Sequence, residues 1–255
     1  MRQYALLATA ALFAVACSDD PTGPDDSLTA NMRADAAEAS GQVIAQDVES
    51  MSSSEASSST MFAFGGELST DGCTGALGVY LCLNTVDDLD GEARLTFRDA
   101  NGTAQDNFDA ATTATAAIEI DTEGSVVRTG FESDYSAERD FVITGMAGAE
   151  TSRTWAGSGT VTATNSEHDT DRGYEYTSTT TYANVVVPAS GTDPRWPTSG
   201  TATTTMELDA TAGPDNGKDA TVTSVVTFNG TANVPLKIGN VTYSLNLDTH
   251  VVTGP

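Results

Sequence analysis

The feature that most constrains this chain is a period-two alternation of apolar and polar residues, which begins near residue 61 and continues to the C-terminus. Leu95 and Phe97, for example, alternate with Arg94, Thr96 and Arg98. Successive side chains of a β-strand point to opposite faces, so this period places apolar residues on one face and polar residues on the other. The pattern predicts strands with one dry and one wet face.

Turn signals separate these strands. Gly239-Asn240 lies between Leu236–Ile238 and Val241–Leu247, and this spacing is typical of a two-residue hairpin. Short turns and the absence of a helical pattern after residue 60 favour an all-β fold over an α/β fold. We therefore expect a long antiparallel meander over residues 61–255 that forms a curved sheet, a sandwich or a barrel, with one short N-terminal helix.

Threonine dominates the polar positions of the later strands. Threonine has high β-propensity and tolerates solvent, so ladders of it suit a solvated sheet face. A polar recognition surface for glycan or mineral is the alternative interpretation. The ladder positions are Thr160, Thr162, Thr164, Thr177, Thr179, Thr181, Thr201, Thr203, Thr205, Thr221 and Thr223.

Residues 30–60 have a different pattern. Small and apolar residues at mixed spacings of three and four predict one weak amphipathic helix from Ala30 to about Met51. We expect Gly41 to break it and its apolar face to be small. Ser52–Thr60 is rich in serine, which is typical of a flexible linker.

The N-terminus has the pattern of an export signal. Arg2 precedes an apolar run of about 12 residues, which is shorter than the roughly 17 to 25 residues that span a bilayer. Ala14-Val15-Ala16-Cys17 resembles the lipobox of bacterial lipoproteins, although Ala14 stands where that family more often has Leu. The resemblance implies removal of residues 1–16 and acylation, including palmitate, at Cys17. An ordinary signal peptide cut after Ala16, with Cys17 free, is the alternative.

The polar, acidic residues 17–29 suit a flexible tether to a lipid anchor. Family sorting rules would keep a lipoprotein in the inner membrane if Asp followed the cysteine, and here Ser18 follows it. The resemblance therefore implies a cell-envelope protein, most simply at the outer membrane.

The charge balance excludes one class of partner. The chain has 11 basic and 36 acidic residues, a formal net charge of −25. A protein that binds nucleic acid must neutralise phosphates, so no nucleic-acid partner is expected. Contact with the membrane is expected through the lipid on Cys17, and the partner in the envelope, protein or glycan, is not specified by the sequence.

Cys73 and Cys82 remain as an even pair once Cys17 is assigned to the anchor. In an exported, oxidising setting a disulfide is the natural pairing. A metal site would need more soft ligands than the two cysteines supply.

Two acidic clusters could coordinate calcium through oxygen ligands. One contains Asp87, Asp88 and Asp90, and the other contains Asp215 and Asp219. Neither fits the twelve-residue calcium loop, and acidic residues beside glycine are equally what β-turns use. Calcium is the one candidate cofactor, and no other metal or cofactor is expected.

No catalytic set is evident. The sequence has no Gly-x-Ser-x-Gly motif, and its two histidines, His168 and His250, lie in turn-like and C-terminal contexts. Trp155 falls in an alternating strand and should be core. Trp196 lies between Arg195 and Pro197, so we expect it in a loop, exposed and able to stack on a ligand.

The runs Leu95–Gly102, Thr154–Val161 and Asn184–Pro188 resemble an uncharacterised group of β-rich, Thr-rich bacterial lipoproteins. That group carries no activity to transfer. We expect a non-catalytic anchored lipoprotein whose β domain serves envelope or surface interactions. The alternatives are a carrier of an apolar ligand in a curved-sheet cavity and a glycan-acting enzyme with two facing carboxylates.

Overall fold

The computed structural model describes residues 28–53, 62, 73–76, 78–86, 88–128, 131–147, 150–167, 171–189 and 195–255. The expected signal peptide, Cys17, the tether up to residue 27 and most of the serine-rich linker lie outside the described residues. The elements are α1 (Ala30–Ser52), β1 (Thr74–Ala76), β2 (Val79–Val86), β3 (Leu89–Asp99), β4 (Ala104–Gln105), β5 (Thr113–Arg128), β6 (Phe131–Thr144), β7 (Ser152–Glu167), β8 (Arg172–Pro188), β9 (Ser199–Ala212), β10 (Asp219–Thr227), β11 (Asn233–Ile238), β12 (Val241–Asn246) and β13 (Val251–Thr253).

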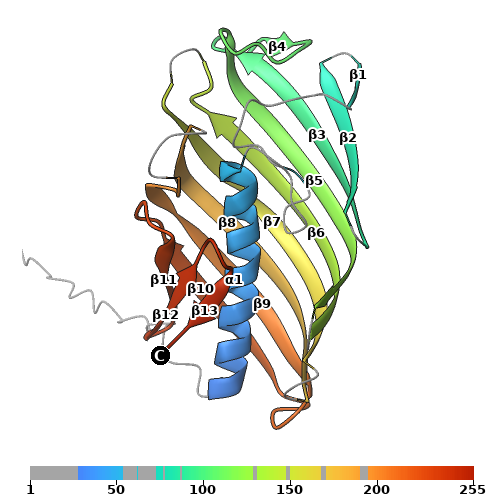
Figure 1. Ribbon diagram of the computed structural model, residues 1–255, viewed down its shortest axis with the longest axis vertical. Helices are drawn as coiled ribbons and strands as arrows, with labels where there is room; N and C mark the ends of the chain where they lie inside the picture. Colours follow the sequence, from blue (N-terminus) through green and yellow to red (C-terminus); the bar gives the residue numbers. More distant parts are fainter. Residues whose placement is uncertain are drawn as a thin grey trace, which may run out of the picture.

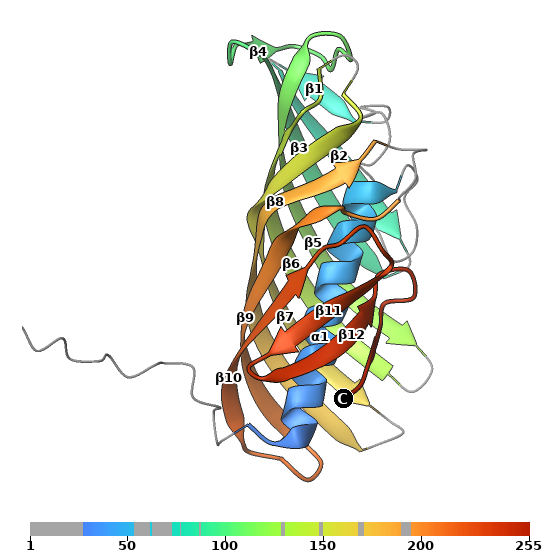
Figure 2. The same ribbon diagram turned by 90° about the vertical axis from the view of Figure 1, so that its left-hand side faces the viewer.

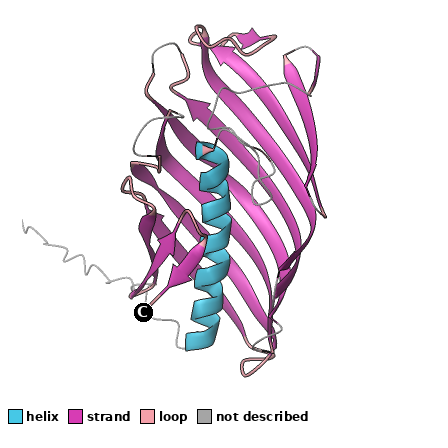
Figure 3. Cartoon of the chain, viewed as in Figure 1, coloured by secondary structure: helices cyan, strands magenta, loops and turns pink. Residues whose placement is uncertain are grey.

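The strands form one antiparallel sheet in nearly sequential order, from β1 through β3, β5 to β13, with β4 paired to β3 on the side (Figure 1). The sheet is strongly curved and does not close. The all-β antiparallel meander with one N-terminal helix is therefore confirmed, and of the three expected arrangements the sheet is the open, curved one. Figure 3 shows how completely strands dominate the described chain.

The period-two pattern of the sequence corresponds to the two faces of this sheet. In β8, Tyr174, Tyr176 and Tyr182 are buried, whereas the intervening Glu175 and Thr177 are exposed. The threonine ladders lie on the outer face as expected: all eleven positions are exposed except Thr201 and Thr203, which are half-buried.

The helix differs from its prediction in two ways. α1 is continuous through Gly41, and only Ala30, Asn31 and Ala34 of its residues are exposed. It lies against the inner face of the sheet, and β11 to β13 fold back across its other side (Figures 1 and 2). A helix that is enclosed on nearly all sides needs no polar face, and that is why its amphipathic signal is weak.

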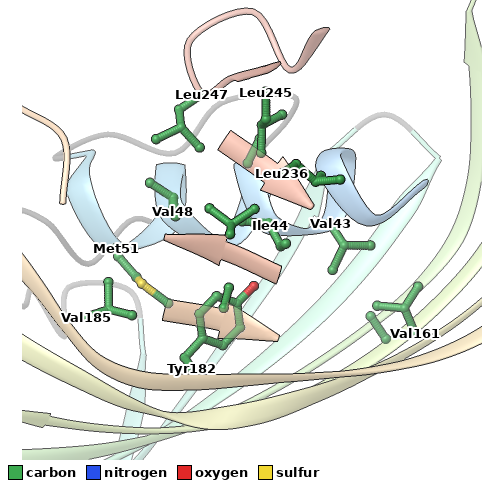
Figure 4. Close-up of a cluster of buried hydrophobic side chains, with 14 of the residues drawn as sticks. Val43, Ile44, Val48, Met51, Val161, Tyr182, Val185, Leu236, Leu245 and Leu247 are labelled. Atoms are coloured by element: carbon green, nitrogen blue, oxygen red, sulfur yellow. The ribbon is translucent and has the colours of Figure 1, made fainter. Parts of the chain in front are cut away.

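Gly41 is an adaptation to close packing and does not break the helix. A Cβ atom built on Gly41 would lie 2.4 Å from Val252 Cγ2 and 3.2 Å from Leu245 Cδ1. The helix therefore approaches β12 and β13 more closely than any side chain would allow. Figure 4 shows Val43, Ile44 and Val48 of α1 in the cluster that Leu236, Leu245 and Leu247 complete.

This packing joins the helix to the strands. The sequence predicts residues 30–60 as a helix and linker ahead of a β domain over residues 61–255, and α1 is that helix. Its side chains belong to the same buried cluster as those of the strands. The β fold and α1 therefore share one core.

Among the described residues, no helix is both long enough and apolar enough to cross a membrane.

Candidate functional site

The buried charges of this very acidic chain lie where α1 meets the sheet. Asp47 of α1 accepts hydrogen bonds from Arg139 Nε on β6 and from the Tyr182 hydroxyl on β8, the latter at 2.6 Å. Arg139 Nη2 also donates to the Tyr135 hydroxyl at 2.8 Å. Asp47 and Arg139 are both buried. The pair joins the helix to the middle of the sheet.

The pKa directions follow from this arrangement. Burial alone would lower the pKa of Arg139, but the Asp47 carboxylate and the Tyr135 hydroxyl together more than offset it, and the pKa lies above its ordinary value. Burial raises the pKa of Tyr182 well above its ordinary range, and Asp47 raises it further. The guanidinium is therefore charged and the phenol neutral at physiological pH, as a structural ion pair requires.

The sheet makes room for this pair with a glycine. Gly159 lies directly opposite Arg139 on β7, and a Cβ atom there would lie 2.9 Å from Arg139 Cγ. In the same cross-strand row follow Thr180, Thr204 and Ser224, all buried. This row of small side chains allows α1 to lie close to the sheet.

An ion pair and a carboxylate–imidazole contact hold the ends of α1. Asp35 pairs with Arg172 of β8 at 2.6 Å, and Glu49 pairs with His250, in the turn before β13, at 3.2 Å. Three acidic residues of one helix thus meet cationic or ionisable partners from three parts of the sheet. His168, the other histidine, lies outside the described residues.

The second acidic cluster also serves the helix. Thr29, the N-cap of α1, accepts a hydrogen bond from Met32 N at 3.2 Å and donates to Asp215 at 2.8 Å. Lys218 binds the other oxygen of Asp215 at 2.7 Å. Hydrogen bonds from Lys218 and Thr29 lower the pKa of Asp215. The structure thus places Asp215 in a turn that anchors the helix start, whereas Asp219 lies on β10.

The candidate site on the outside of the molecule is a hollow of about 570 Å³ over β2, β3, β5 and β6. Most of its lining side chains alternate along the strands with buried residues, so they lie on the sheet face turned away from α1. Its lining includes Leu83, Asp90, Glu92, Arg94, Asp121, Glu123 and Glu138.

Carboxylates face one another across the strands of this region. Asp121 lies opposite Glu138, and Glu119 lies opposite Asp140. Like charges directly opposite in a sheet are destabilising. Arg94 offsets part of this repulsion, since it pairs with Glu92 at 2.6 Å and approaches Glu119 at 3.9 Å. The hollow therefore has a negative potential that suits cationic groups.

The first acidic cluster contributes to this hollow only in part. Asp90 lines it and accepts a hydrogen bond from Thr85 Oγ1 at 2.8 Å, Asp88 is exposed in the β2–β3 turn, and Asp87 lies outside the described residues. Within the described ranges, no three His, Cys, Asp or Glu residues are arranged to hold a metal ion. Calcium at Asp87, Asp88 and Asp90 stays a prediction.

Both tryptophans are buried, and only the burial of Trp155 agrees with the expectation. Trp155 is fully buried, as predicted, with its ring edge-on to Phe141. The expected exposure of Trp196 is wrong, because the residue is 8% exposed and belongs to the core cluster. The Arg195 guanidinium lies 4.4 Å from its ring centroid. A stacking platform for a ligand at Trp196 is therefore already taken by Arg195 and the core.

The disulfide is confirmed: Cys73 is bonded to Cys82, and it ties the residue before the edge strand β1 to the neighbouring strand β2.

Sequence reasoning missed the helix-docking charges. Asp47 and Arg139 are 92 residues apart, and nothing local distinguishes either from the other charged residues of the chain. No signal in the helix sequence singles out Asp35 or Asp47, because other polar residues, such as Glu38, Gln42 and Gln46, lie between them.

Comparison of the chain with protein-family models, with curated proteins and with solved structures finds no match.

Proposed function

We propose that this protein is a non-catalytic lipoprotein of the bacterial envelope, anchored through acylated Cys17, whose β domain presents its outer face to envelope or surface partners. The anchor rests on the lipobox-like Ala14–Cys17 and the acidic tether that follows it. The described residues begin at Leu28 and lead directly into α1.

The observation that carries the non-catalytic part is how the inner face is used. α1 occupies the part of it formed by β8 to β10, and the buried ionisable groups there, Asp47, Arg139 and Tyr182, bind one another. Their shifted pKa values have a structural cause, the docking of the helix, and do not require a reaction to explain them.

The outer face supports the binding part. It combines exposed threonine ladders with cross-strand carboxylate pairs and a hollow of about 570 Å³. The size of the hollow would accommodate a small ligand. Its charged lining suits a cationic or hydrogen-bonding partner better than the apolar ligand of a carrier.

The experiment compares wild type with Asp121→Asn and Glu138→Gln variants on panels of glycan and ester substrates. The hollow is where a glycan-acting enzyme would place its two carboxylates, so it is the sharpest place to look. We expect no turnover by any of the three proteins. Turnover by the wild type that one substitution abolishes, with an unchanged circular dichroism spectrum, contradicts the proposal.

A further inference from the structure

β10 leaves part of one edge unpaired. It pairs with β9 along its whole length, from Asp219 to Thr227. On its other side it pairs with β11 only through Ser224–Val226, because β11 turns away across α1. Within the part of the chain that the structure describes, Asp219–Thr223 therefore has no strand partner on that side.

The direction of the backbone groups follows from two printed hydrogen bonds at the ends of the β9–β10 pair. Phe228 N donates to Gly200 O at 3.1 Å, and Ala210 N donates to Lys218 O at 2.9 Å. Hydrogen-bonded pairs alternate along an antiparallel ladder, so the even-numbered residues of β10 bond to β9. The odd-numbered Asp219, Thr221 and Thr223 then direct their N–H and C=O groups to the open edge.

The residues of this edge keep the period-two pattern of the sheet. The side chains of Asp219, Thr221 and Thr223 are exposed, whereas the intervening Ala220 and Val222 are buried on the inner face. An open edge of this kind is a template for an added strand, which would gain main-chain hydrogen bonds from all three residues.

The surface beside this edge has a distinct charge. Asp219 lies opposite Asp209, and Asp209 lies opposite Glu175, so three exposed carboxylates form one row across β10, β9 and β8. Glu207 is exposed in the next row, opposite Thr221. Lys218, the nearest cation in the sequence, is bound to Asp215. A strand added here would extend the acidic row.

We propose that the β10 edge from Asp219 to Thr223 binds an extended, basic segment of a partner polypeptide as an additional β-strand. Lys or Arg side chains at alternate positions would face the carboxylate row, and the intervening apolar side chains would lie beside Ala220 and Val222. A second copy of this chain does not fit, because it would bring the same carboxylates together. The inference rests on the proposed function and names the partner chemistry of one part of the presented surface.

The test uses the full mature chain and a seven-residue peptide of alternating Lys and Val with blocked ends. Amide hydrogen exchange is measured by NMR with and without the peptide. We expect the amides of Asp219, Thr221 and Thr223 to exchange quickly in the free protein and at least tenfold more slowly with saturating peptide. A Glu-Val peptide of the same length serves as the charge control and should give no protection.

Thr221→Pro removes the central N–H group, and an edge position that faces solvent tolerates proline. We expect it to weaken binding at least tenfold, whereas Thr221→Val, which keeps the N–H group, should bind like the wild type. A double Asp209→Asn, Asp219→Asn variant, which leaves the backbone unchanged, should also bind several-fold more weakly. It provides the test if the proline variant does not fold.

Absence of binding, equal binding by Thr221→Pro and Thr221→Val, or protection on other strands alone would overturn the edge proposal. Protection confined to the strands under the hollow, β2, β3, β5 and β6, would overturn the edge proposal and leave the proposed function in place. Failure of the proposed function itself would be seen as a different result, the turnover of a substrate.

Discussion

At the scale of single residues, the interior of this protein contains a few polar groups with very specific partners. Asp47 and Arg139 are the clearest case, because each would be costly to bury without the other. They join α1 to β6, and Tyr182 joins the same carboxylate to β8. These two contacts of Asp47 hold the helix in one position on the sheet.

Asp47→Asn should destabilise the protein by about 3 to 5 kcal/mol, because it leaves the Arg139 charge buried without its counterion. The free energy of unfolding is measured by urea denaturation. Asp140→Asn is the matched control, since Asp140 is an exposed carboxylate opposite Glu119, and its effect should stay within about 0.5 kcal/mol or stabilise slightly. Equal effects of the two substitutions would contradict the assigned role.

The buried tyrosines predict a loss of stability at alkaline pH. Burial raises the pKa values of Tyr174, Tyr176 and Tyr182 above the ordinary value near 10. The neutral phenol is thus favoured in the folded state, and this contribution is complete below pH 10 and decreases as pH rises beyond it. Unfolding free energies at pH 8 and pH 11 should differ, and Tyr182→Phe should reduce the difference. An equal free energy at both pH values would be inconsistent with these shifts.

At the scale of elements, the strands could be predicted from the sequence and the place of the helix could not. In segments such as Leu95–Phe97 the alternation shows directly which side chains are buried, because neighbouring residues of a strand point to opposite faces. Most contacts of α1 are with β8 to β13, which lie more than a hundred residues away, and its ion pair with β6 joins residues 92 positions apart. The same limit applies to Trp196, whose burial depends on distant strands and whose flanking prolines suggested only a loop.

Gly41→Ala tests the close approach of α1. Alanine favours the helix by about 1 kcal/mol over glycine. Its methyl group would, however, overlap Val252 Cγ2. We expect a net loss of about 1 kcal/mol or more by urea denaturation. In a Val252→Ala background the same substitution should become neutral or stabilising. Stabilisation in the wild-type background would mean that the helix does not approach β13 this closely.

The disulfide should act mainly on the β1–β2 edge of the sheet. In the chain-entropy estimate, closing so short a loop contributes about 2 to 3 kcal/mol. Replacing both Cys73 and Cys82 with Ser should lower the unfolding free energy by about that amount and increase amide exchange in β2 more than in β8. An increase of the same size in both strands would show that the bond supports the whole sheet.

At the scale of the whole molecule, the fold combines an open sheet with a helix that covers part of its inner side. Asp35 and Asp47 of the helix are paired with arginines, whereas many acidic residues of the described strands are exposed on the face with the hollow and the carboxylate rows. An anchored protein of this kind would be held at a membrane by its lipid and kept extended from an anionic surface by repulsion. The outer face is then what partners can reach.

Native mass spectrometry of the protein extracted from membranes tests this account most directly. The predicted mass is that of a chain that begins at acylated Cys17 and carries no further apolar ligand, because the apolar side chains of the inner face are buried in one cluster with those of α1. The matched Cys17→Ala variant should appear in the soluble fraction without acyl chains. An unmodified N-terminus, or a stoichiometric lipid that the Cys17→Ala variant also retains, would contradict the account.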